Sequence, residues 1–245
     1  MIVGIIQPYY MPWRGYFDLI DQVDLFIFYN DVPFGQGKKR INRNVIKTRS
    51  GSRWITVPLK HRHRDSLIRD VQIDYSRDWP RDHLNLLYEN YHESPFWGSY
   101  IEGFANLINE RYASISDLNI ALCKWVMGCL NIGTRVETSD QYQAKGGKQE
   151  RPLALLLEIG ATAFLSGPTA EPYTPSSLFR SQGIGLSFKS HEYSEYPQLW
   201  GDFSGHVSIL DLLFNVGQEA RAYLRSRVPN VVAVALGEFN EASHR

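Results

Sequence analysis

Cysteine is scarce in this chain, which has two cysteines among 245 residues. Cys123 and Cys129 lie six residues apart in a segment with a helical pattern, so they fall on different helix faces. That spacing is unsuited to a disulfide and matches no metal motif. Both are expected to be core residues of a reduced protein, and we predict a cytoplasmic location.

Long apolar runs are also lacking. No stretch approaches the roughly 18 consecutive apolar residues that span a bilayer, and the first residues lack the basic start and the cleavage site of a signal peptide. Charged residues at 21% and hydrophobic residues at 43% exclude global disorder. We expect one globular domain over residues 1–245, without membrane insertion.

The chain has no net charge, because 26 Lys and Arg balance 26 Asp and Glu. The balance hides an asymmetry: residues 33–64, the basic arm, hold ten Lys and Arg and no acid. The rest of the chain has 16 cationic residues against 26 acidic ones. A short basic arm on an acidic body favours a small, discrete anion over a long nucleic acid.

The hydrophobic pattern predicts a strand at 2–7, a helix at 15–23 and a strand at 24–29, which together form a βαβ unit of a parallel sheet. Two alternating runs, 42–48 and 53–59, are joined by a Ser-Gly-Ser turn and predict a hairpin. Further helices are expected at 80–92, 96–112, 118–130, 151–159 and 209–214, and further strands at 134–137, 161–165 and 185–189. We therefore predict an α/β protein: a mainly parallel sheet flanked by helices, with an inserted basic β-hairpin at about 33–64 and an added helical layer at about 80–131.

Generic catalytic motifs are absent. The chain contains no G-x-S-x-G, no Walker loop, no G-x-G-x-x-G and no H-E-x-x-H. A metal site is not expected. His83, His191 and His206 are candidate general bases, although none has a motif partner.

Three segments carry the chemistry that the residues suggest. The first is the turn after the first strand, where polar and aromatic groups crowd together between two prolines. A turn at the carboxyl end of a parallel strand is where such sheets bind ligands, and a following helix start can hold an anion. The alternative is that the tyrosines and Trp13 only cap the sheet. The binding candidates here are Tyr9, Trp13, Arg14 and Tyr16, together with Gln7.

The basic arm is the second segment. Arginine offers a bidentate fork to phosphate and lysine a point charge, so Arg40, Arg43 and Lys47 are the phosphate candidates, with Asn42 and Asn44 beside them. Two alternatives remain open. The cations can form a solvated hairpin that resists edge pairing, or the arm can bind RNA.

The third segment, Ser166 to Tyr173, is a polar Gly/Pro loop after a late strand. If that strand lies beside the first one, both loops face one crevice. A simple β-turn is the alternative. Asp31 ends the second strand near the basic arm, where it can orient a cation or act as a base.

At these residues the sequence resembles the WbqC-like family, a bacterial group often encoded among genes for O-antigen and other surface polysaccharides. The resemblance rests on I-I-Q-P-x-Y-x-P-W-x-G-Y-F-D-L-I at 5–20, D-x-F-x-F-x-x-D-V at 24–32, the R-N-R-x-I-K-like run at 41–47, W-x-T-V-P at 54–58, L-S-G-P at 165–168 followed by Tyr173, Tyr196-Pro197-Gln198 and S-x-L-D-L-L-F-N-x-G at 208–217. It therefore spans nearly the whole chain.

The resemblance implies transfer of an aminoacyl group, glycine in particular, to the amine of an amino sugar carried on a nucleotide or phosphorylated carrier. The phosphates of such a substrate would suit the basic arm, and its sugar and base would suit the aromatic turn. The reaction needs a base and oxyanion donors, so Asp31, Gln7 and His191 are catalytic candidates. Ser166, Gly167 and Tyr173 join the binding set, and the Gly167 backbone is the oxyanion donor. No cofactor is expected beyond an activated acyl donor.

Other functions stay open. One is a non-catalytic nucleotide-sugar-binding or scaffold protein of the polysaccharide machinery, and another is an enzyme that uses aminoacyl-tRNA as donor. The opening strand, loop and helix are also similar to those of nucleotidylyl-transferring α/β enzymes, whose H-x-G-H signature would fall on residues 13–16. Both histidines are missing from that position. A homodimer is the expected assembly.

Overall fold

The computed structural model describes residues 1–35, 40–63, 65–147 and 149–235. Six strands form its main sheet in the order β5-β2-β1-β6-β7-β8. Numbered along the chain within this sheet, that order is 3-2-1-4-5-6, the order of a doubly wound fold. Five strands are parallel, and β8 is antiparallel to β7. Their bounds are β1 Ile2–Ile6, β2 Leu25–Phe28, β5 Arg135–Thr138, β6 Ala163–Ser166, β7 Gly185–Phe188 and β8 Val231–Val234.

Strands β1 and β2 lie between two layers of helices. Val3 and Ile5 of β1 pack against one layer of helices, while Phe26 and Phe28 of β2 pack against the other. Gly4 lets helix α1 lie close to the sheet, since a Cβ there would come within 2.7 Å of Leu19.

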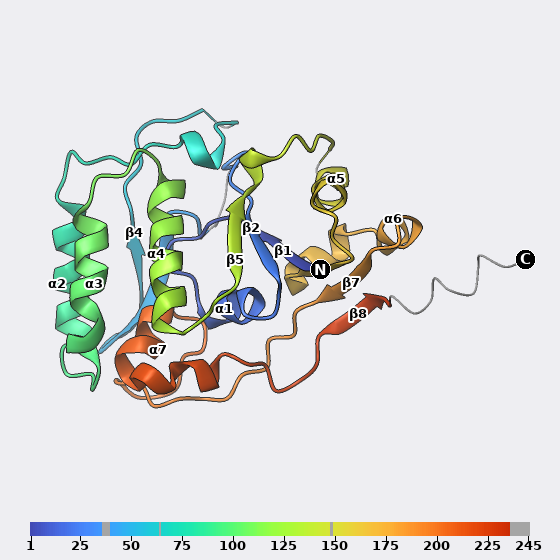
Figure 1. The fold of residues 1–245 in the computed structure, drawn as a ribbon. Coiled ribbons are helices and arrows are strands. Elements are labelled where there is room, and N and C mark those ends of the chain that lie inside the picture. Colours follow the sequence, from blue (N-terminus) through green and yellow to red (C-terminus); the bar gives the residue numbers. More distant parts are fainter. Residues whose placement is uncertain (36–39, 64, 148, 236–245) are drawn as a thin grey trace, which may run out of the picture.

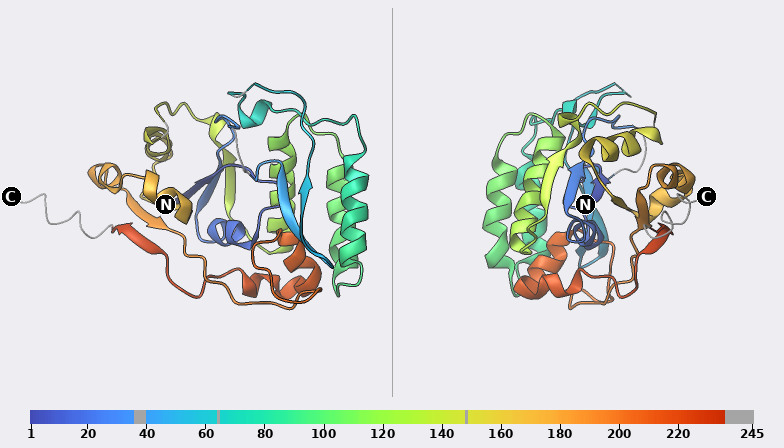
Figure 2. Two further views of the ribbon diagram at one scale, coloured as in Figure 1. Left: turned by 180° about the vertical axis from the view of Figure 1, so that it is seen from behind. Right: turned by 45° about the vertical axis from the view of Figure 1, so that its right-hand side comes forward.

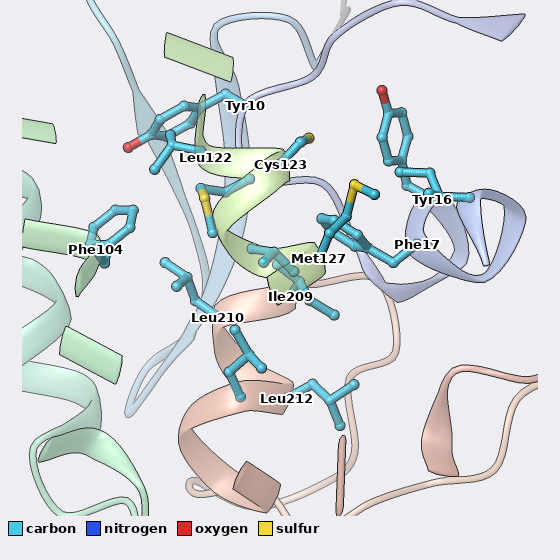
Figure 3. Close-up of a cluster of buried hydrophobic side chains, with 14 of the residues drawn as sticks. Tyr10, Tyr16, Phe17, Phe104, Leu122, Cys123, Met127, Ile209, Leu210 and Leu212 are labelled. Carbon is cyan, nitrogen blue, oxygen red and sulfur yellow. The ribbon is translucent and has the colours of Figure 1, made fainter. Parts of the chain in front are cut away.

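Helices cover both faces of the sheet (Figure 1). On one face lie α1 (Arg14–Ile20) and α4 (Ile115–Cys129), whose side chains interlock with those of α7 (Ile209–Val216) in the core shown in Figure 3. On the other face lie α5 (Glu150–Ile159) and α6 (Ser176–Ser181). The expected α/β architecture is confirmed.

The hairpin stands apart from the main sheet, as predicted. Among the described residues, strands β3 (Arg43–Thr48) and β4 (Gly51–Thr56) pair only with each other, and Gly51, directly after the turn, has a φ of 110°. Helices α2 (Trp79–Tyr91) and α3 (Trp97–Asn109) form the added layer beyond it (Figure 1). Short 3-10 turns complete the chain: η1 Ile68–Asp70, η2 Ser139–Gln141, η3 Pro168–Tyr173 and η4 Gly217–Tyr223.

The segment between β7 and β8 crosses the molecule to the hairpin and returns (Figure 2). At its far end Ser208 donates its backbone N–H to Val45 of the hairpin, and Phe96 at the start of α3 donates to Phe214. This crossing segment packs over the first turn of α1. It also supplies two histidines, His191 and His206, to the site described below.

Several element boundaries differ from the sequence expectations. The helix expected at 118 begins at Ile115, because Ser114 and Asp117 form a reciprocal capping box. Asn131, not Gly133, takes the left-handed conformation after that helix. Strand β8 and helix α6 were not predicted. No helix among the described residues is long and apolar enough to cross a membrane.

Candidate functional site

A cleft of about 600 Å³ lies at the carboxyl ends of β1 and β6. From β1 the chain moves to β2 on one side, whereas β6 leads to β7 on the other, so these strands flank the switch point of the sheet. Open α/β sheets bind ligands at this point. The cleft is lined by Ile5, Ile6, Gln7, Tyr9, Trp13, Gly15, Tyr16, Leu19, Tyr29, Arg40, Ser166, Gly167, Pro168, Thr169, Ala170, His191 and His206.

The turn after β1 and the loop after β6 therefore share one crevice. Among the predicted site residues, the structure brings Gln7, Tyr9, Trp13, Tyr16, Arg40, Ser166, Gly167 and His191 together along it. His206 joins them from the segment that crosses the molecule.

Trp13 forms an aromatic wall of the cleft. Its ring meets His191 edge-on at 4.8 Å between centroids and lies tilted against His206 at 5.4 Å. Gly15 makes room for the indole, since a Cβ at this position would lie 2.5 Å from Trp13 Cζ2. Only glycine permits this ring position, which explains the glycine inside the first turn of α1.

The tyrosines beside Trp13 stay protonated. Burial raises the pKa of Tyr16, whose hydroxyl donates to the carbonyl of Gln7 at 3.0 Å. Burial also raises the pKa of Tyr9, and the nearby Arg40 charge only partly offsets it. Both phenols are therefore neutral hydrogen-bonding groups, and Tyr16 fixes the backbone at the end of β1.

His191 lines the cleft beside Trp13. Burial of its ring, followed by the charge of Lys189, lowers the pKa of this imidazole. It is therefore neutral near pH 7 and can accept a proton or a hydrogen bond.

Lys189 is held by a buried acid that sequence reasoning missed. Its ammonium lies 2.7 Å from Asp18, and the two side chains are 1% and 0% exposed. Asp18 also accepts hydrogen bonds from the hydroxyl of Tyr193 (2.9 Å) and the backbone of Ser226 (3.2 Å). The sequence did carry a signal for this buried acid, because Asp18 interrupts the apolar pattern of the predicted first helix.

Arg14 does not reach the cleft. Its guanidinium donates to the carbonyls of Ser194 (2.6 Å) and Tyr223 (3.3 Å), and it lies over the rings of Tyr193 and Tyr196. The residue is 4% exposed. Arg14 thus fastens the C-terminal segment to α1, because the helix turns its side chain away from the loops.

Arg40 is the member of the expected phosphate set that lines the cleft. It donates to Asn44, which in turn donates to the backbone of Tyr10 and Met11. Arg43 lies over the ring of Trp54 at 4.7 Å and does not line the cleft.

Lys47 and Asn42 serve the hairpin itself. The ammonium of Lys47 is buried and donates to Gln198 and to the carbonyls of Gly201 and Asp202. Asn42 donates to the carbonyl of Val57 across the hairpin. Lys38, Lys39 and Arg64, also counted in the basic arm, lie outside the described residues.

Asp31 lines a neighbouring cleft of about 580 Å³ with Arg151, Gly146 and Gly147. Although burial acts to raise the pKa of Asp31, hydrogen bonds from Arg151 and Ser139 hold it below the usual value. Asp31 is consequently an ionised partner of Arg151, separate from the main cleft.

A second lobe of about 380 Å³ opens from the main cleft and contains Tyr173. Gln7 and Tyr29 line all three hollows, so they mark their junction. Within the described ranges, no group of three or more histidine, cysteine or acidic side chains is placed to hold a metal ion.

Comparison with known proteins places this site in a family. Residues 7–223 match the WbqC-like protein family. The chain belongs to the WbqC-like protein family. It is 41% identical over 226 residues to "Uncharacterized protein Rv1507c" of Mycobacterium tuberculosis (strain ATCC 25618 / H37Rv), an alignment that covers 91% of this chain and 97% of the relative. No solved structure matches. All lining residues of the main cleft from Gln7 onward fall within the family match.

Proposed function

We propose that this WbqC-like protein is a transferase that acylates an amino sugar carried on a nucleotide or phosphorylated carrier, with an aminoacyl group such as glycyl. The observation that carries the proposal is the cleft at the switch point. It combines an aromatic wall, a neutral imidazole and one cation of the basic arm.

The lining suits the parts of such a substrate. The faces of Trp13 and Tyr9 offer apolar surface to a sugar ring, and Arg40 offers a charge-assisted contact to phosphate. The loop at Ser166 and Gly167 approaches from the other strand. A small phosphorylated metabolite is thereby enclosed on two sides, whereas a long nucleic acid would need a continuous basic surface.

The reaction is a direct acyl transfer. The amine nitrogen forms a bond to the acyl carbonyl carbon, and the bond from that carbon to the donor's leaving group breaks, with the electron pair going to the leaving group. The proton released from the amine passes to neutral His191 and on to water. Gln7 and the Gly167 backbone N–H are the proposed donors to the oxyanion.

Asp31 takes an indirect part in this proposal. Its carboxylate is committed to Arg151, so it orients the loop at the end of β2 instead of accepting the amine proton. The neutral imidazole of His191 is the better acceptor because it lines the main cleft.

Paired variants test the binding step. Arg40 and Arg43 both lie over Trp54, at 5.5 and 4.7 Å, but only Arg40 lines the cleft. We expect Arg40→Ala to weaken the binding of UDP-glucosamine by about ten- to hundredfold, measured by calorimetry, because a charge-assisted contact contributes about 1.5–3 kcal/mol. Arg43→Ala should bind within about twofold of wild type. Equal losses in both variants would contradict the assignment of Arg40.

Turnover is tested with the same sugar nucleotide and an activated glycine, supplied as glycyl-tRNA or as a glycyl thioester. Mass spectrometry should show a glycyl amide on the sugar amine. Binding without product would favour the non-catalytic alternative. Product only with glycyl-tRNA, at a rate that falls steeply with salt, would favour the aminoacyl-tRNA alternative.

A further inference from the structure

The second lobe differs in chemistry from the main cleft, although Gln7 and Ser166 line both. Arg40 and two histidines line the main cleft, whereas none of the residues described along the second lobe carries a charge. A phosphate or carboxylate would lose its hydration there without gaining a countercharge. The second lobe therefore suits a neutral group.

Aromatic side chains contribute to the apolar lining of this lobe. Phe164 of β6 and Phe179 of α6 stack with an interplanar angle of 15° and centroids 5.8 Å apart. Both are buried, and Pro152 of α5 adds further apolar surface. An aromatic ring system can make apolar contacts with such a lining.

Neutral polar groups stand at the rim. The hydroxyl of Thr174 donates to the carbonyl of Ala170 at 2.8 Å, which leaves its lone pairs available to a ligand donor. The carboxamide of Gln149 is exposed at the start of α5 and makes no capping hydrogen bond. Amide and hydroxyl groups of this kind can form hydrogen bonds with the donors and acceptors on the edge of a heteroaromatic ring.

We propose that the second lobe is a nucleoside subsite. It takes the base and ribose of a nucleotide-linked substrate, while the phosphates pass Ser166 toward Arg40 and the sugar lies against Trp13. This inference rests on the proposed function for the identity of the sugar, but the uncharged lining and the stacked rings carry it. The volume of about 380 Å³ falls in the range of small-molecule pockets, roughly 300–1,000 Å³.

The experiment fills the second lobe and leaves the main cleft open. Thr174→Trp introduces a bulky ring at a lining position, and Glu171→Trp places the same ring at an exposed position of the same loop that lines neither lobe. Adenosine, guanosine, cytidine, uridine and glucosamine 1-phosphate are each titrated by calorimetry. At least one nucleoside should bind wild type and the Glu171→Trp variant, and Thr174→Trp should weaken it at least tenfold. Glucosamine 1-phosphate should bind all three proteins equally.

Three results overturn the proposal: no nucleoside binds wild type, Thr174→Trp leaves nucleoside affinity unchanged, or Trp13→Ala weakens the nucleoside more than glucosamine 1-phosphate. If Thr174→Trp does not fold by circular dichroism, the exposed Gln149→Ala variant replaces it. A several-fold loss for at least one nucleoside is then expected, and no loss for any of them overturns the proposal.

The same variants separate this inference from the proposed function. Nucleoside binding that depends on the second lobe, without any acylated product, would mean that only the proposed transferase activity fails. Acylation of UDP-glucosamine that proceeds with unchanged KM in Thr174→Trp would mean that only the nucleoside subsite fails.

Discussion

The carboxylate of Asp18 and the ammonium of Lys189 form a buried ion pair 2.7 Å apart beside the candidate site. The pair joins α1 to the end of β7. Asp18 also accepts hydrogen bonds from Tyr193, just after β7, and from Ser226, on the returning path toward β8. Tyr193, which donates to Asp18, also packs edge-on against Trp13 of the cleft at 5.6 Å between ring centroids. The cleft wall is therefore connected to a contact between residues 171 positions apart in the chain.

Breaking this pair should strongly destabilise the protein. We expect Asp18→Asn and Lys189→Met each to lower the free energy of unfolding by about 3–5 kcal/mol, because each leaves an uncompensated buried charge. The double variant should lose less than the sum of the two single losses. Urea denaturation followed by circular dichroism measures all four proteins, and strictly additive losses would contradict the pairing.

Gly15→Ala should impair ligand binding without unfolding the protein. Alanine is the better helix former by about 1 kcal/mol, but its methyl group would occupy the place of the Trp13 ring. We expect a shifted tryptophan emission spectrum and weaker binding of UDP-glucosamine. Gly128→Ala in α4 is the control, because a Cβ there meets nothing within 4 Å. It should leave affinity unchanged and raise stability slightly, and equal affinity in both variants would contradict the role of Gly15.

Much of the fold was predictable because its patterns are local. Continuous apolar runs mark β1 and β2, and their βαβ connection predicts parallel pairing. The shared crevice of the two polar loops followed from the rule for carboxyl ends of parallel strands. Strand β8 was missed because its four residues, Val231–Val234, carry too little pattern and depend on pairing with β7.

The roles of the cations were less predictable because their partners are distant in sequence. Arg14 and Lys47 look like ligand-binding residues in their own segments, yet both are held by the segment that crosses the molecule. Arg40 and Arg43 differ by three positions, and only the path of the chain before β3 brings Arg40 into the cleft. Local composition predicts a basic arm, but it does not predict which of the cationic side chains remain available to contact a ligand.

Lys47 should therefore act on stability. Lys47→Met removes the buried ammonium that donates to three oxygen atoms of the crossing segment, and we expect the free energy of unfolding to fall by about 2–3 kcal/mol. Lys60→Met is the matched control on the same arm, since Lys60 is exposed and its ammonium donates to the exposed Gln72. It should change the free energy of unfolding by less than about 0.5 kcal/mol. Equal free energies of unfolding for the two variants in urea denaturation would contradict the role of Lys47 in holding the crossing segment.

His83 should make the protein less stable in mild acid. Its ring lies between the hydroxyl of Tyr10, which donates to Nδ1, and the carbonyl of Thr56, which accepts from Nε2. Burial lowers the pKa of His83 to about 4, so the native state stays neutral where the unfolded chain, with a pKa near 6.5, binds a proton. This contribution to stability is complete above about pH 6.5 and declines by about 3 kcal/mol as the pH falls to about 4. His83→Gln removes the titration, so its unfolding free energy should vary less steeply with pH over that window than that of wild type. Equal slopes would show that the native imidazole is not held neutral.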